Sequence, residues 1–236
     1  MNDIKTQFEQ AIRAIDNNKT FFDPADFPWA RQVESHWPLI RQELDRLLRC
    51  VDMLPGFEEI QAEQESLSTD KRWKIFPLYA YGQRIETNER RCPETTRALA
   101  AIPGLRAAMF SVLQPHKELP PHTGPFAGVL RYHLGVKVPP NRQCGIQVGA
   151  DVRYWEEGKS MIFDDSHMHS AWNRSDEDRV VLFVDFTRPL TGSYAAINEN
   201  FIVAISKSDF ITEATDQWMK WETVHGAELD RELSLS

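Results

Sequence analysis

The chain has 236 residues, and its 35 Asp and Glu outnumber its 27 Lys and Arg, so the formal net charge is −8. This acidic balance excludes nucleic-acid binding through a broad basic surface. Three widely spaced cysteines, Cys50, Cys92 and Cys144, are typical neither of a secreted disulfide framework nor of a zinc knuckle. We therefore expect a reduced, cytoplasmic protein, with no transmembrane segment because no apolar run approaches ~18 residues.

Helical periodicity marks the first part of the chain. Apolar residues recur at helical spacing over Ile4–Ile15, and Asn17-Asn18 then break the pattern. A second helical segment covers about Trp29–Met53, and Pro55-Gly56 ends it. These helices are expected to pack outside a sheet as a structural cover.

After Lys71 the sequence changes to short strand-like runs divided by turn clusters. Consecutive runs mostly lack a helix between them, which indicates antiparallel pairing and hence a sandwich or barrel. One helix is predicted around 92–102, and the polar tail over 208–233 is predicted to be helical. The predicted strands cover 73–79, 107–113, 128–136, 145–148, 160–163 and 179–186.

Two of these strands carry polar side chains on one face. Because side chains alternate along a strand, Arg131 and His133 share a face between small neighbours, which favours a pocket wall. The alternative is the solvent face of an edge strand. Arg179 heads an apolar strand, where an arginine serves either as a structural ion-pair partner or as a bidentate clamp on a carboxylate.

Two histidines have settings that favour metal binding. His122 stands in the rigid, turn-like stretch 120–125, and His169 follows 47 positions later, where an apolar strand ends in polar residues. With Arg179 ten residues further on, this is the layout of a non-haem iron oxygenase that uses a 2-oxo acid. The usual site of that class adds a carboxylate two residues after the first histidine. Here that position is Gly124.

Several motifs are specific only in combination. They are Pro121–Pro125, Leu130–Gly135, Trp155–Lys159, Ile162–His169, Trp172-Asn173 and Arg179. Together they resemble the catalytic domain of the aspartyl/asparaginyl β-hydroxylases, over about 73–189. The resemblance implies a mainly β protein, a double-stranded β-helix of the jelly-roll or cupin-like kind with N-terminal and C-terminal helices packed outside. It also implies binding of Fe(II) and 2-oxoglutarate, and hydroxylation of an unactivated carbon with O2.

The resemblance assigns roles around the metal. His122 and His169 would be the iron ligands, and family members share the glycine found at Gly124. Asp165 would be a catalytic acid that reaches the metal's water, which would partly offset the missing carboxylate. The residues just before His169 depart from the family pattern, and His167, two positions earlier on the same strand face, is an alternative surplus ligand.

The resemblance also assigns roles around the cosubstrate and substrate. Arg179 and Ser111 would hold the distal carboxylate of 2-oxoglutarate, with His133 near its metal-bound end. Arg131 would pair with a carboxylate or amide of the substrate. Family members that act on protein Asp or Asn often have a second arginine two residues earlier, and here Val129 removes that anion contact.

We predict a single domain over 1–236, with a helical N-terminal part (1–70), a β-helix catalytic core (71–190) and a C-terminal extension (191–236). The predicted function is that of a 2-oxoglutarate-dependent dioxygenase that hydroxylates Cβ of an Asp- or Asn-like unit. Its substrate would be a small molecule, a peptide or a carrier-bound amino acid.

Two alternatives remain open. Hydroxylases of lipid A acyl chains share this fold and these motifs, so an acyl-chain hydroxylase is the first. A non-catalytic β-helix module for binding or sensing is the second, and the presence of His122, His169 and Arg179 argues against it.

Overall fold

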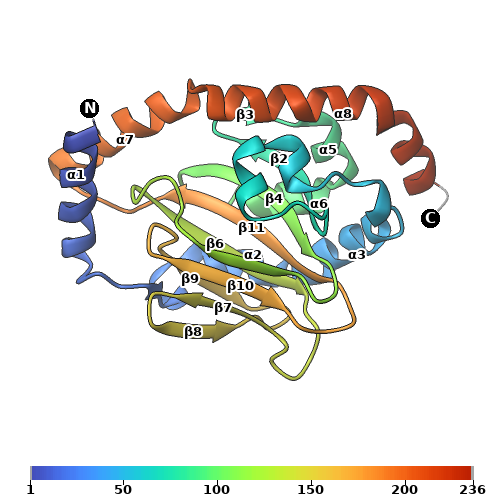
Figure 1. Ribbon diagram of the computed structural model, residues 1–236, viewed down its shortest axis with the longest axis horizontal. Helices are drawn as coiled ribbons and strands as arrows, with labels where there is room; N and C mark the ends of the chain where they lie inside the picture. The colour runs from blue at the N-terminus through green and yellow to red at the C-terminus, as the bar shows by residue number, and fades with distance from the viewer. Residues whose placement is uncertain (1, 235–236) are drawn as a thin grey trace.

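Two antiparallel β-sheets form the centre of the computed structural model, which describes residues 2–234 (Figure 1). The larger sheet has the strand order β1-β9-β6-β11-β4-β2-β3, and the smaller has the order β5-β10-β7-β8. The strands are β1 Phe21–Phe22, β2 Trp73–Ala80, β3 Gln83–Arg84, β4 Leu105–Leu113, β5 Glu118–His122, β6 Val129–Lys137, β7 Cys144–Val148, β8 Asp151–Tyr154, β9 Ser160–Phe163, β10 His169–Asn173 and β11 Arg179–Thr187.

Helices cover the outside of this β core. In Figure 1, α8 and α7 run along one side of the molecule, and α1 lies beside α7 at one end. The helices are α1 Asn2–Ile15, α2 Pro28–Ser35, α3 Trp37–Leu48, α4 Phe57–Ile60, α5 Glu86–Arg91, α6 Pro93–Leu99, α7 Gly192–Ser206 and α8 Asp209–Ser234, with 3-10 turns η1 Pro24–Asp26, η2 Val51–Met53 and η3 Ala62–Ser66. The predicted fold class, a double-stranded β-helix with helices outside, is confirmed by this arrangement.

The structure differs from the predicted elements at two proline sites. The helix expected over 29–53 is two helices, because Pro38 lies in the first turn of α3, where its missing amide hydrogen costs nothing. The sequence Glu118–His122 contains two prolines, yet it forms β5. It does so at the edge of the smaller sheet, a position where a strand tolerates proline. Strands β8 and β10 and helix α7 were also not expected.

The central pair β6 and β11 sets the position of the site. β6 pairs with β9 on one side and β11 on the other, so it is an interior strand and the edge-strand alternative is wrong. In this register Arg131 lies opposite Asp185, and His133 lies opposite Phe183. Both strands are almost wholly buried. Within the described residues, no helix has the length and apolar character that crossing a membrane requires.

Candidate active site

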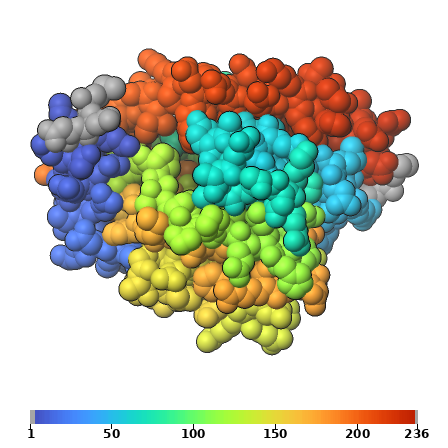
Figure 2. All heavy atoms as spheres, in the orientation of Figure 1, coloured from blue at the N-terminus to red at the C-terminus, as the bar shows by residue number. Residues whose placement is uncertain are grey.

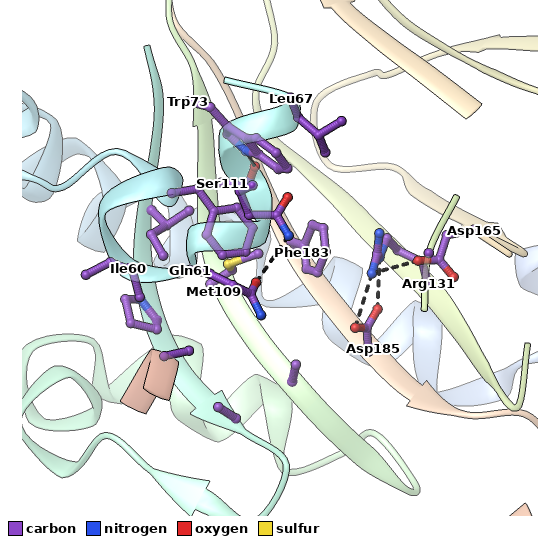
Figure 3. A pocket seen from close by; sticks show the side chains of 18 of the residues that line it. Ile60, Gln61, Leu67, Trp73, Met109, Ser111, Arg131, Asp165, Phe183 and Asp185 are labelled. Atoms are coloured by element: carbon purple, nitrogen blue, oxygen red, sulfur yellow. Dashed lines mark hydrogen bonds and ion pairs between the residues drawn. The ribbon is translucent and has the colours of Figure 1, made fainter. Parts of the chain in front are cut away.

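A cavity of about 440 Å³ is lined by residues of both sheets and of the helices that cover them. Figure 3 shows one part of it. All seven residues predicted for the site line this cavity, although they come from five strands and one turn. They are Ser111, His122, Arg131, His133, Asp165, His169 and Arg179. The structure therefore brings the predicted set together, and the roles assigned to its members stay predictions.

The two candidate metal ligands stand on neighbouring strands. β5 and β10 pair so that His122 lies opposite His169, and the centroids of the two imidazole rings are 4.1 Å apart. Nδ1 of His122 is 2.8 Å from the carbonyl oxygen of Pro120, and Nδ1 of His169 is 2.9 Å from that of His167. Because a carbonyl only accepts, each Nδ1 carries the proton, and each Nε2 keeps a free lone pair.

The charge state of the two histidines suits metal binding. Burial lowers the pKa of His122, and it lowers that of His169 to about 3. Both imidazoles are therefore neutral at neutral pH, as metal ligation requires. Among the described residues no group of three or more His, Cys, Asp or Glu could hold a metal ion, so the protein offers this site two side-chain ligands.

Asp165 fills the space in which the usual carboxylate ligand would stand. A Cβ atom at Gly124 would lie 2.0 Å from Asp165 Oδ2 and 2.3 Å from its Cγ. The amide of Gly124 also donates to the carbonyl oxygen of Asp165 at 2.7 Å. A carboxylate therefore stands beside the first histidine, but it belongs to the turn before β10. Burial raises its pKa to about 7.

Arg131 is held by two buried carboxylates. Its Nε and Nη2 donate to Asp185 at 2.9 and 3.2 Å, and its Nη2 is 2.8 Å from Asp165 Oδ2 (Figure 3). The guanidinium also stacks on the Phe183 ring. Burial alone would lower the pKa of Arg131, but the two carboxylates raise it. In the described part of the chain, the carboxylate of Asp165 accepts no hydrogen bond of good geometry, so its two oxygens can receive one from another donor.

A second group of polar side chains lies deeper, without an acid. Arg179 is buried beside Trp155, and its Nε has no hydrogen-bond partner. His133 Nδ1 accepts from Trp155 Nε1 at 3.2 Å, so its proton is on Nε2, which is buried and has no partner either. Ser111 Oγ accepts from Trp73 Nε1 at 3.0 Å, which leaves its hydroxyl hydrogen free to be donated.

The electrostatics of this group match an anionic ligand. Burial lowers the pKa of Arg179 to about 10, and no carboxylate of residues 2–234 forms an ion pair with it. Burial together with Arg131 and Arg179 holds the pKa of His133 well below its usual value. Buried donors without partners cost free energy, and an anionic ligand whose oxygens accept from both side chains would remove that cost.

The turn that carries Asp165 is fixed by a buried ion pair. Arg188 contacts Asp164 and Asp16, and it donates to the carbonyl oxygen of Ala127 at 2.7 Å. His167 lies in the same turn rather than in a strand, so the expectation that it shares a strand face with His169 is wrong. His167 is 3.8 Å from Asp164 and does not line the cavity.

The remainder of the cavity wall is mostly apolar and was not foreseen from the sequence. It is built from α4, η3 and the first half of α8, which lie over β2 and β4. Figure 2 shows the cyan and teal segment around 57–75 against the core, directly beneath the red helix α8. Apolar lining residues in this part include Phe57, Ile60, Leu67, Trp73, Met109, Ile211 and Trp218.

Comparisons with a family model and with known proteins agree on one family. A family model described as aspartyl/asparaginyl beta-hydroxylase matches residues 34–189. The ornithine lipid ester-linked acyl 2-hydroxylase of Rhizobium tropici is 44% identical over 214 residues, which are 90% of this chain and 76% of that protein. The aspartyl/asparaginyl beta-hydroxylase of Homo sapiens is 34% identical over 164 residues, 67% of this chain and 21% of its own length.

Among solved structures, the Schizosaccharomyces pombe Cnp3 cupin domain aligns with 57% of this chain and 73% of its own, at 12% identity and a TM-score of 0.36. The evidence for the family is the sequence match, which covers the strands that carry the whole candidate site. The chain belongs to the aspartyl/asparaginyl β-hydroxylase family and is a hydroxylase.

Proposed function

We propose that this hydroxylase depends on Fe(II) and 2-oxoglutarate, and that its substrate is an acyl chain. The observation that carries the proposal is the pairing of two features in one cavity. Two neutral histidines present free Nε2 atoms, and beside them His133 Nε2 and Arg179 Nε are buried donors without partners. When bound, iron and 2-oxoglutarate supply the oxidising chemistry with O2.

The residues present fit Fe(II). Neutral imidazole is a favoured ligand of this ion, and His122 and His169 would hold it through Nε2. The backbone carbonyls of Pro120 and His167 fix the two tautomers, as outer partners of metal-bound histidines commonly do. Asp165 would accept a hydrogen bond from water on the metal.

The residues present also fit 2-oxoglutarate. Arg179 and Ser111 would bind its distal carboxylate, because an arginine without an acid partner offers a charged, forked donor and the serine offers a hydroxyl. His133 Nε2 would donate to an oxygen at the end nearer the metal. Trp155 orients His133 for this through its own indole hydrogen bond.

The acyl-chain substrate is supported by the rest of the cavity. Its wall over α4, η3 and α8 is mostly apolar, so a chain of methylenes would bury itself there favourably. Arg131, expected from the sequence to pair with a substrate carboxylate, already has two carboxylate partners. The Rhizobium tropici relative, which acts on an acyl chain, matches 90% of this chain.

Hydroxylation at Cβ of an Asp- or Asn-like unit is the second candidate. It is favoured by the family description and by the human relative, although this chain spans about a fifth of that relative's length. In this case the Arg131 pair with Asp165 or Asp185 would have to rearrange on substrate binding.

Two measurements test the proposal. Anaerobic addition of Fe(II) and 2-oxoglutarate is expected to give a metal-to-ligand absorption band in the visible that His122→Ala abolishes. Succinate release and the mass gain of one oxygen atom are then followed with acyl lipids and with Asp-containing peptides. Stimulation by peptides alone favours the second candidate. Binding of 2-oxoglutarate without turnover on any substrate favours a non-catalytic binding module.

A further inference from the structure

An amide side chain stands among the apolar residues of the cavity wall. Gln61 connects α4 to η3, and only 7% of it is exposed. Ile60, Leu67 and Met109 are among the residues that line the cavity with it (Figure 3). An amide group in such a setting takes its hydrogen-bond partners from the protein, from water or from a ligand in the cavity.

Within the described residues, the side-chain amide of Gln61 takes part in one hydrogen bond. Gln64 Nε2 donates to Gln61 Oε1 at 3.2 Å, and both side chains line the cavity. No hydrogen bond among the described residues engages Gln61 Nε2 or Gln64 Oε1. The pair therefore has one donor and one acceptor that are free for a ligand. If the oxygen and nitrogen of both amides are exchanged, one donor and one acceptor are still free.

The backbone around the pair is well fixed. The amide of Gln61 donates to Phe57 at 2.9 Å, and the amide of Gln64 donates to Gln61 at 3.0 Å. Glu59 caps the start of α4 at Gly56 and pairs with Lys71, which ties this segment to the strand that follows. The two amides thus project from a rigid turn, as a group that selects a ligand requires.

We propose that the Gln61–Gln64 pair binds a secondary amide of the acyl substrate, and that it prefers this group to an ester at the same point of the cavity. The inference rests on the acyl-chain function proposed above. A secondary amide carries an N–H and a C=O, so it would satisfy both remaining atoms of the pair. An ester has no donor and would leave the acceptor of the pair without a partner.

A hydroxyl group fits the pair less well. Its donor and acceptor share one oxygen atom, whereas the free donor and acceptor of the pair stand on two side chains separated by the hydrogen bond between them. A carboxylate fits least, because it has no donor and Gln64 Oε1 would face a negative charge. The geometry therefore selects a neutral group with its donor and acceptor on different atoms.

Calorimetry with two short-chain probes tests this inference. The probes are a secondary amide and the ester of the same length, which differ by one N–H. The native chain is expected to bind the amide about tenfold more tightly, from the gain of one hydrogen bond to the pair. Gln61→Leu and Gln64→Leu should each bring the two affinities close together. Gln217→Leu, an exposed position on α8 outside this cavity, should keep the native preference.

The possible results distinguish failure of this inference from failure of the acyl-chain function on which it rests. An amide preference that survives in Gln61→Leu and Gln64→Leu overturns the inference and leaves the acyl-chain function standing. A hydroxylated chain that binds as tightly as the amide, and loses affinity in both variants, overturns the choice of amide. Failure of both probes to bind overturns the inference together with the acyl-chain function.

Discussion

The carboxylate of Asp165 occupies the space that a side chain at Gly124 would need, since a Cβ atom on the glycine would lie 2.0 Å from Oδ2 of the aspartate. The two residues are far apart in sequence and are joined by the backbone hydrogen bond between Gly124 N and Asp165 O. The absence of a side chain at Gly124 is thus a packing requirement of the carboxylate beside it. The missing third ligand and the buried acid are one structural feature.

Gly124→Ala should therefore displace the Asp165 carboxylate. We expect a loss of about 10- to 100-fold in Fe(II) affinity or turnover, the range typical of lost outer partners at metal sites. Isothermal titration with Fe(II) under anaerobic conditions measures the first quantity. The variant should also be less stable, and Gly124→Ala/Asp165→Ala should recover part of that loss because the methyl group then has room. Strict additivity of the two stability changes would contradict a shared volume.

Arg131 should prove to be a structural residue as well as a site residue. Arg131→Met leaves Asp165 and Asp185 buried without their shared cation, so the free energy of unfolding should fall by about 3–5 kcal/mol. Urea denaturation measures this change. Arg31→Met, at an exposed arginine of α2, is the matched control and should change stability by less than about 0.5 kcal/mol. Full stability of Arg131→Met, with only substrate affinity lost, would support a substrate-binding role instead.

Much of the β core was predictable because it follows local rules. The alternation along β6 and β11 places Arg131, His133 and Arg179 on the cavity face, as expected. The motif set identified the family, and the family match covers the same region. Strands with strong alternation or a continuous apolar run were found, whereas β5 and β10 were missed because prolines and polar residues dominate them.

The rest depended on contacts between distant segments. The cavity wall joins η3 to α8, and no periodic pattern in either segment indicates that they meet. The second carboxylate on Arg131 is visible only in the register that sets Asp185 opposite it. His167 was considered as a ligand because a strand was extended through it, and the turn fixed by Arg188 and Asp164 is the reason that this was wrong.

Arg179 is expected to lower the stability of the protein when 2-oxoglutarate is absent. Its guanidinium is buried without an acid partner among the described residues. Stacking on Trp155 and a long hydrogen bond from Nη1 to the carbonyl oxygen of Ser111, 3.5 Å, offset only part of the desolvation cost. Arg179→Met should raise the free energy of unfolding by at least about 1 kcal/mol. At 100 times its dissociation constant, 2-oxoglutarate should stabilise the native chain by about 2.7 kcal/mol and leave Arg179→Met unchanged.

Thermal and urea unfolding, with and without 2-oxoglutarate, check both halves of this prediction. Arg179→Lys is the informative second variant, because it keeps a positive charge but loses the planar fork that binds a carboxylate at two points. We expect it to respond weakly to 2-oxoglutarate. Loss of stability in Arg179→Met would mean that the contacts of the arginine with Trp155 and the Ser111 carbonyl compensate its burial in full.

His133 should make the stability of the protein sensitive to acid. Burial and the nearby arginines hold its pKa in the folded protein well below the usual 6.5, whereas the unfolded chain binds a proton at about 6.5. Below that pH the unfolded state therefore binds more protons, and stability falls as pH falls. The loss contributed by one such group is at most about 1.4 kcal/mol per pH unit.

Urea unfolding of the native chain and of His133→Leu, from pH 8 to pH 5 with a metal chelator present, isolates this contribution. Asp165 has the opposite effect, because its raised pKa makes the folded state bind more protons between about 4 and 7. Asp165 is present in both proteins, so its effect cancels in the difference between them.

His133→Leu should be less stable than the native chain at pH 8, because it lacks the hydrogen bond with Trp155. Its free energy of unfolding should fall by up to about 2 kcal/mol less on acidification. Parallel pH curves for the two proteins would mean that His133 takes up its proton equally well in the folded chain, which its buried position between Arg131 and Arg179 opposes.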